Sequence, residues 1–93
     1  MKINKTYIKD LLIIEPQLFK DHRGFFYESY NKKKLDKIIK IAFVQDNESK
    51  SYKGSIRGLH FQAPPFEQTK IVRCVSGNIL DVAVDLRTNS KTY

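Results

Sequence analysis

Cysteine is almost absent from this sequence, with Cys74 as its only occurrence among 93 residues. One cysteine cannot close a disulfide within the chain, so a disulfide-stabilised secreted fold is excluded. Long apolar runs are missing as well: none approaches the roughly 20 residues that cross a bilayer, and the first residues lack the apolar stretch of a secretory signal. These absences predict a cytoplasmic protein that neither enters a membrane nor is exported.

The residue patterns of common metal and cofactor sites are also missing. His22 and His60 are the only histidines, and there is no His-x-His or Cys-x-x-Cys pair. A metal site usually needs several such ligands close together. No Gly-x-Gly-x-x-Gly or Gly-x-x-x-x-Gly-Lys-Ser/Thr loop occurs either. We therefore expect neither a metal nor an organic cofactor.

Acidic residues are fewer than basic ones: the chain has 17 lysines and arginines and 10 aspartates and glutamates, which gives a net charge of +7. A basic surface attracts phosphate groups without specifying which molecule carries them. The densest basic run, residues 32–34 followed by Lys37 and Lys40, is typical of a solvated helix face, with nucleic-acid binding as the alternative interpretation.

The residues that are present suffice for one domain over residues 1–93. Hydrophobic residues make up 41% of the chain, but a unit of this size buries too little surface to be stable by a wide margin. Asn31 is expected to cap a short helix with an apolar stripe of Leu35, Ile38 and Ile39. Apolar and aromatic runs predict six strands, over residues 11–14, 25–30, 41–47, 55–62, 69–75 and 79–87.

These elements predict a mainly β fold of mostly antiparallel strands. Residues 21–24 read as a turn, and residues 76–78 as the turn of a hairpin between the last two strands. The last predicted strand would leave an open sheet edge. We therefore expect further chain or a second copy of the protein to complete the sheet.

His60, in the sequence RGLHFQ over residues 57–62, is the first candidate for chemistry. Histidine is the side chain most easily tuned to abstract a proton near neutral pH, although many histidines are only structural. Arg57 lies three residues earlier, so a regular strand would place it on the opposite face. A bulge at Gly58 would bring both to one side.

Lys70 is the second candidate, because it lies on an otherwise apolar predicted strand. A two-residue hairpin loop would place it on one face with Asp81 and Asp85. A lysine there can stabilise a developing oxyanion or form a structural ion pair. The third candidate combines Arg23, which can hold a phosphate, with Phe26, which can stack on a base.

Several motifs together resemble the dTDP-4-dehydrorhamnose 3,5-epimerase family, and the resemblance runs from about Leu11 to Tyr93 in order and spacing. The motifs that carry it are DHRGFFYE at residues 21–28, FVQDN at 43–47, GSIRGLHFQ at 54–62, KIVRCVSG at 70–77 and DVAVDLR at 81–87. It implies part of a cupin-type (double-stranded β-helix) barrel, cytoplasmic and homodimeric, that needs no metal or cofactor. The implied reaction inverts the carbons beside the C4 ketone of a dTDP-linked 4-keto-6-deoxyhexose, in dTDP-L-rhamnose biosynthesis.

The resemblance also implies residue roles. His60 matches the family's general base, and Lys70 and Arg57 match substrate-binding residues. The nucleotide-binding stretches, part of which the neighbouring subunit of a family dimer supplies, are matched by Arg23, Phe26, Glu28, Gln45, Asp46 and Asn47. The family's general acid, a tyrosine, and the carboxylate that orients the histidine belong to its second half, and this chain resembles only the first. The alternative to an epimerase part is a non-catalytic remnant that binds nucleotide sugars or dimerises.

Overall fold

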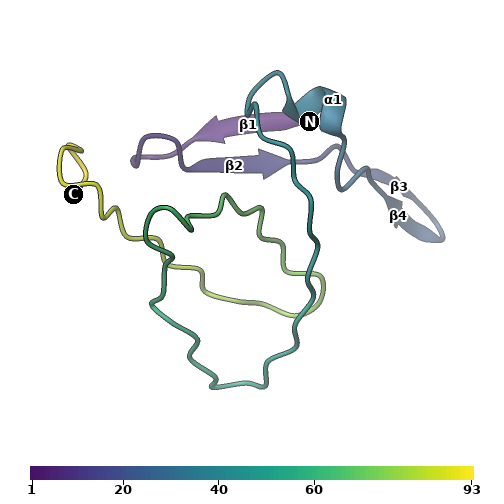
Figure 1. Cartoon of the computed structure of the whole chain (residues 1–93). Helices are drawn as coiled ribbons and strands as arrows, with labels where there is room; N and C mark the ends of the chain where they lie inside the picture. The colour runs from purple at the N-terminus through teal and green to yellow at the C-terminus, as the bar shows by residue number, and fades with distance from the viewer.

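A computed structural model describes all residues, 1–93, and its regular structure is mainly β (Figure 1). The four strands form two separate antiparallel hairpins, β1 with β2 and β3 with β4. The elements in chain order are β1 (Lys2–Lys5), β2 (Leu12–Glu15), β3 (Phe19–Asp21), β4 (Gly24–Phe26) and α1 (Lys32–Leu35). No helix has the length and hydrophobicity that a bilayer crossing requires.

The β1–β2 hairpin confirms the strand predicted over residues 11–14, displaced by one residue. Its register pairs Lys2 with Glu15 and Lys5 with Leu12. The strand ends before Pro16, which has no backbone N–H to donate to a ladder. Its partner β1 was not predicted from the sequence.

The β3–β4 hairpin confirms the turn predicted over residues 21–24. The Asp21 side chain accepts a hydrogen bond from the Arg23 backbone N–H at 2.8 Å, and Gly24 supplies a φ of 141°. β4 extends only to Phe26, because β3 has three residues and each pairs with one residue of β4. The strand predicted over residues 25–30 is therefore formed only at its start.

Helix α1 confirms the predicted cap, since the Asn31 side chain accepts a hydrogen bond from the Lys34 backbone N–H at 3.1 Å. The regular helix ends at Leu35, whose carbonyl accepts from both Ile38 and Ile39 in a tight closing turn. Leu35 is buried, whereas Ile38 is 41% exposed, so the predicted apolar stripe is only partly covered.

Residues 41–87 form no ladder, and the strands predicted at 41–47, 55–62, 69–75 and 79–87 are wrong as elements of this chain. The segment runs as an open ring below the β1–β2 hairpin in Figure 1. No backbone hydrogen bond joins residues 69–75 to residues 79–87, so the predicted last hairpin is not paired. A strand depends on a partner at ladder distance, and this ring places none there.

A polar clasp of Asp85, Arg87 and Asp10 joins the end of the chain to the β1–β2 turn. Arg87 donates to Asp10 Oδ2 at 3.0 Å and to the Lys9 carbonyl at 2.8 Å. Asp85 accepts from Arg87 Nε at 2.9 Å and from the Thr92 hydroxyl at 2.6 Å, with its side chain only 2% exposed. The clasp therefore connects segments 77 residues apart.

Replacing Asp85 with asparagine is expected to release this clasp. The Arg87 guanidinium holds the pKa of Asp85 far below its usual 3.8, so the stabilisation is complete above that value and is lost as the pH falls below it. In Asp85→Asn, hydrogen exchange at the Leu11 and Ser90 amides should be about tenfold faster at neutral pH. In the unmodified chain, the protection factors of the same amides should decline below pH 3.8.

Asp21→Asn is the matched control for that prediction. Asp21 and Arg23 form an ion pair at 2.6 Å with the same spacing along the chain as Asp85 and Arg87, but they are exposed and reach no distant segment. Equal effects of the two substitutions on the Leu11 and Ser90 amides would contradict a specific role for the clasp.

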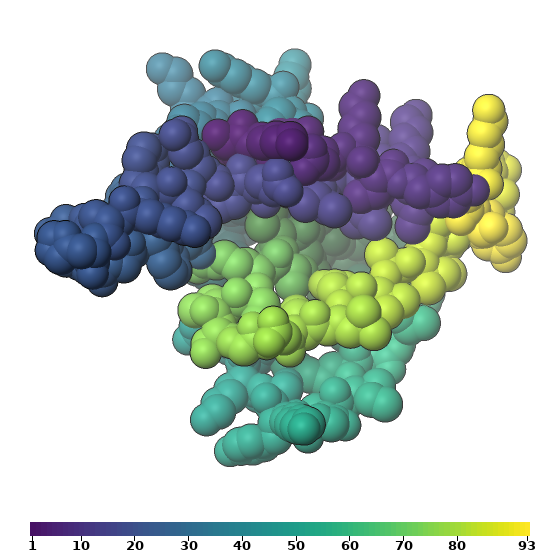
Figure 2. Space-filling view, turned by 180° about the vertical axis from the view of Figure 1, so that it is seen from behind, coloured from purple at the N-terminus to yellow at the C-terminus, as the bar shows by residue number.

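Most of the apolar surface of this chain is uncovered. The accessible area is 9404 Å², against about 5,600 Å² for a compact monomer of this mass, an excess of roughly 3,800 Å². The radius of gyration is 15.5 Å, against about 12 Å for a compact domain of this length. Figure 2 shows the segment around residue 80 (yellow-green) crossing the molecule between the N-terminal strands (purple) and the segment around residue 50 (teal). An excess of this size in one chain is larger than the roughly 1,000–2,500 Å² that each partner of an obligate interface usually buries.

Candidate active site

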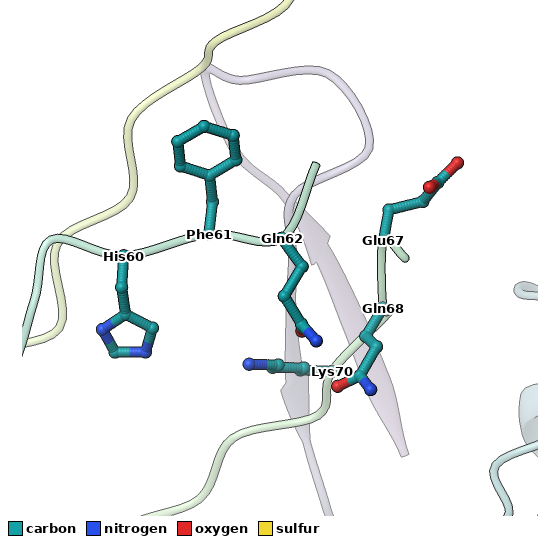
Figure 3. A pocket seen from close by; sticks show the side chains of 6 residues that line it. All are labelled: His60, Phe61, Gln62, Glu67, Gln68 and Lys70. Carbon is teal, nitrogen blue, oxygen red and sulfur yellow. The ribbon is translucent and has the colours of Figure 1, made fainter. Parts of the chain in front are cut away.

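An open hollow of about 220 Å³ lies between two facing segments of the ring. Figure 3 shows the His60 imidazole and the Gln62 amide on one side of their segment, with Phe61 on the other. The Lys70 side chain reaches across the hollow toward the imidazole. The lining residues are His60, Phe61, Gln62, Glu67, Gln68 and Lys70.

Two local features of the chain build this arrangement. An extended backbone sends alternate side chains to the same side, which aligns His60 with Gln62. After Gln62 the chain turns, with the Phe66 N–H donating to the Ala63 carbonyl at 2.9 Å, and returns with Lys70 facing the histidine. A base and a cation ten residues apart therefore line one space.

The hollow is only part of a ligand site. Complete small-molecule pockets measure about 300–1,000 Å³ and enclose most of their ligand. This one is smaller and open, and Phe61 is its only hydrophobic lining residue. The polar lining suits a sugar, and further walls are needed to enclose one.

Gly58 lets the His60 ring fold back over the backbone. Its φ is +109°, and a Cβ at this position would lie 2.9 Å from His60 Nδ1 and 3.2 Å from the His60 backbone nitrogen. The bulge predicted at Gly58 is wrong as a strand feature, because no strand forms here, and Gly58 does not bring Arg57 to the side of His60. Arg57 does not line the hollow, because its guanidinium contacts Ser49 instead.

The predicted common face of Lys70 and Asp85 is wrong. Lys70 forms no ion pair within 4.0 Å, whereas Asp85 is bound within the clasp. Asp85 lines a second hollow beside the β1–β2 turn, together with Asp10 and Arg87. The ammonium group of Lys70 therefore has no carboxylate partner in this chain.

The candidates on the β3–β4 hairpin and just after it contact nearby residues, and none of them lines the hollow. Arg23 is paired with Asp21, and this contact lowers the pKa of the Asp21 carboxyl. Phe26 packs against Phe19 with ring centres 6.5 Å apart. Glu28 pairs with Lys34 at 2.9 Å and accepts a hydrogen bond from Asn31, and the contact with Lys34 is the main reason that its pKa is lowered.

The candidates at residues 45–47 lie at a third place. Gln45 Nε2 donates to Asn47 Oδ1 at 3.2 Å, and the Asp46 side chain makes no hydrogen bond or ion pair. No hydrogen bond or ion pair joins any candidate of the hairpin or of residues 45–47 to His60 or Lys70. The structure thus brings His60 and Lys70 together and leaves the nucleotide-binding candidates apart from them.

Glu67 and Gln68 line the hollow and were missed by sequence reasoning. Their position depends on the turn at residues 63–66, whose only sequence signal is the Ala63-Pro64-Pro65 break. Gln62 could be placed beside His60 from the two-residue alternation alone. The structure gathers no three His, Cys, Asp or Glu side chains in a metal-binding arrangement.

Comparison with known proteins adds a family match over most of the chain. A family model described as dTDP-4-dehydrorhamnose 3,5-epimerase matches residues 5–93. Proteins named dTDP-4-dehydrorhamnose 3,5-epimerase from Shigella flexneri and Escherichia coli K12 are 54% and 50% identical over 100% of this chain. One from Methanothermobacter thermautotrophicus is 49% identical over 96% of it.

The chain spans about half the length of the curated relatives it matches: 52% of the Shigella protein, 51% of the Escherichia protein and 48% of the Methanothermobacter protein. No solved structure matches it.

Proposed function

Because this chain belongs to the dTDP-4-dehydrorhamnose 3,5-epimerase family, we propose that it supplies the proton-abstracting part of an epimerase acting on a dTDP-linked 4-keto-6-deoxyhexose. The observation that carries the proposal is the shared hollow, in which the His60 imidazole and the Lys70 ammonium face one space. The names of the relatives indicate the substrate class.

The reaction follows from the acidity of a carbon beside a ketone. His60 takes the proton from this carbon, and the electron pair of the broken C–H bond forms an enolate whose negative charge falls on the C4 oxygen. The Lys70 ammonium stabilises that charge, directly or through a water molecule. Return of a proton to the opposite face of the carbon inverts it and restores the ketone. The family resemblance assigns the acid, a tyrosine, to the second half of the fold.

The remaining candidates are proposed to bind the nucleotide sugar: Arg57 beside the hollow, and Arg23, Phe26, Glu28, Gln45, Asp46 and Asn47 around the nucleotide. Their separation from His60 within one chain supports a homodimer in which one copy completes the site of the other. The β3–β4 hairpin projects from the body (Figure 1), with Phe25 and Phe26 66% and 70% exposed. Such a hairpin fits against a second copy.

A cupin-type barrel closed by a second half is the architecture that we propose for the complete domain. The uncovered apolar side chains of residues 71–86, among them Val72, Leu80 and Val84, support this. They would form one wall of the barrel when strands of that second half pair with residues 71–86. The strands predicted over residues 41–87 would then acquire their ladder partners.

A turnover assay tests the proposal. This chain, alone and mixed with a separately produced second half of the Shigella flexneri relative, is incubated with dTDP-4-keto-6-deoxyglucose in D₂O. The mixture is expected to incorporate deuterium beside the ketone, and the chain alone to incorporate none. An assembled mixture that leaves the sugar unchanged refutes the epimerase assignment, and dTDP binding without exchange identifies the non-catalytic alternative.

A further inference from the structure

Arg57 has no carboxylate partner, a property it shares with Arg73, but its guanidinium is held by serine hydroxyls and lies over no aromatic ring. Arg23 and Arg87 are paired with Asp21 and Asp85. Arg73 donates to the Tyr27 hydroxyl at 3.1 Å and lies over the Tyr27 ring. Arg57 contacts only hydroxyl groups, so its positive charge is not compensated within the chain.

Two serine hydroxyls hold the Arg57 guanidinium. Its Nη1 donates to Ser49 Oγ at 2.8 Å and, less closely, to Ser51 Oγ at 3.4 Å. The Ser55 N–H donates to the Tyr52 carbonyl at 3.1 Å, which reverses the chain and lays residues 49–51 beside Arg57. Both contacts use one edge of the guanidinium, and no other hydrogen bond occupies its Nε or Nη2.

The surroundings of this guanidinium are basic. Residues 48–57 contain Lys50, Lys53 and Arg57 against a single acid, Glu48. A neutral hydroxyl fixes the orientation of a guanidinium and leaves its positive charge uncompensated. A carboxylate would fix the orientation and also neutralise the charge. The planar guanidinium fork fits an oxyanion by two parallel hydrogen bonds. The arrangement is therefore prepared for an anion.

We propose that Ser49 and Ser51 are positioning residues that hold Arg57 for the diphosphate of the nucleotide sugar. This inference rests on the proposed function, because the diphosphate is the anionic group of a dTDP-linked hexose. Arg57 precedes His60 by three residues, so the diphosphate would be held immediately beside the hollow for the sugar. Fixing the guanidinium before binding reduces the entropy that binding must overcome.

The test uses the chain assembled with the second half of the Shigella relative. Calorimetric titrations with dTDP, inorganic pyrophosphate and thymidine compare the unmodified chain with Ser49→Ala and with the Ser49→Ala/Ser51→Ala double variant. The double variant is expected to bind dTDP and pyrophosphate about three- to tenfold more weakly and thymidine equally well. KM should rise by a similar factor while kcat stays near its original value.

Two controls separate positioning from folding. Ser49→Thr keeps the hydroxyl and should restore dTDP affinity, and Ser55→Ala removes a hydroxyl that makes no hydrogen bond and should have no effect. Unchanged dTDP and pyrophosphate affinity in the double variant overturns the inference, as does an equal loss for thymidine. If the unmodified assembly binds no dTDP, the proposed function itself fails. That result differs from the two above, which concern only the serine variants.

Discussion

Replacing His60 with glutamine is expected to lower the turnover of dTDP-4-keto-6-deoxyglucose by the assembled protein about a hundred- to ten-thousandfold, the range that a positioned general base contributes. Glutamine keeps the length and polarity of the side chain but cannot accept the proton. Because the imidazole lines the hollow and the nucleotide-binding candidates lie elsewhere, dTDP affinity should remain within about twofold. Turnover and solvent deuterium incorporation measure the first effect, and calorimetry measures the second.

His22→Gln is the matched control, since His22 is the other histidine of the chain and lies in the exposed β3–β4 turn. It should retain near-normal deuterium incorporation. If His60→Gln incorporated deuterium as fast as the unmodified assembly, another group would be the base and the role of the hollow would have to be abandoned. A parallel loss of dTDP affinity would instead indicate that His60 supports binding.

Features decided by neighbouring residues could be predicted from the sequence. The Asp21 side chain closes a turn on the backbone of Arg23, two residues away, and Asn31 caps a helix through Lys34, three residues away. These contacts involve only groups that stay close in any conformation of the chain. The end of β2 before Pro16 follows from proline itself, which lacks the donor.

Features that depend on distant partners could not be predicted in the same way. The apolar alternation over residues 79–87 describes a segment suited to a sheet, but a pattern cannot supply the neighbouring strand. The clasp was missed because Asp10 and Arg87 are 77 residues apart. Asp85 was assigned to the face of Lys70 by assuming a regular hairpin, and without that hairpin its carboxylate binds Arg87.

The candidate site residues also divide into those placed by local contacts and those that need distant partners. His60 and Lys70 lie in one hollow because a local turn, at residues 63–66, returns the chain. Arg23 in the β3–β4 turn and Glu28 just after β4 have local ionic partners and do not line that hollow. The proposed homodimer or second half of the fold would bring the two groups together, and a single sequence contains no geometric record of such contacts.

Replacing Gly58 with alanine is expected to lower turnover by up to about a hundredfold, the effect of displacing a catalytic group by about 1 Å, because the new Cβ crowds both the ring and the backbone of His60. The added Cβ would lie 2.9 Å from His60 Nδ1 and 3.2 Å from the His60 backbone nitrogen. The ring can rotate away, but the backbone atom cannot yield without moving the segment. The imidazole would then leave the position from which it faces Lys70, while dTDP affinity should persist. Turnover, dTDP calorimetry and the NMR shifts of the His60 ring measure these effects.

Gly77→Ala separates this collision from simple backbone strain. Gly77 has a φ of +81°, also unfavourable for alanine, but a Cβ there would meet no atom within 4 Å. Both variants should therefore lose stability to a similar degree, and only Gly58→Ala should lose turnover beyond that shared effect. If the two lost turnover equally, strain alone would explain the result. Glycine at position 58 would then be needed only for its positive φ, and the space that it leaves for the imidazole would have no catalytic consequence.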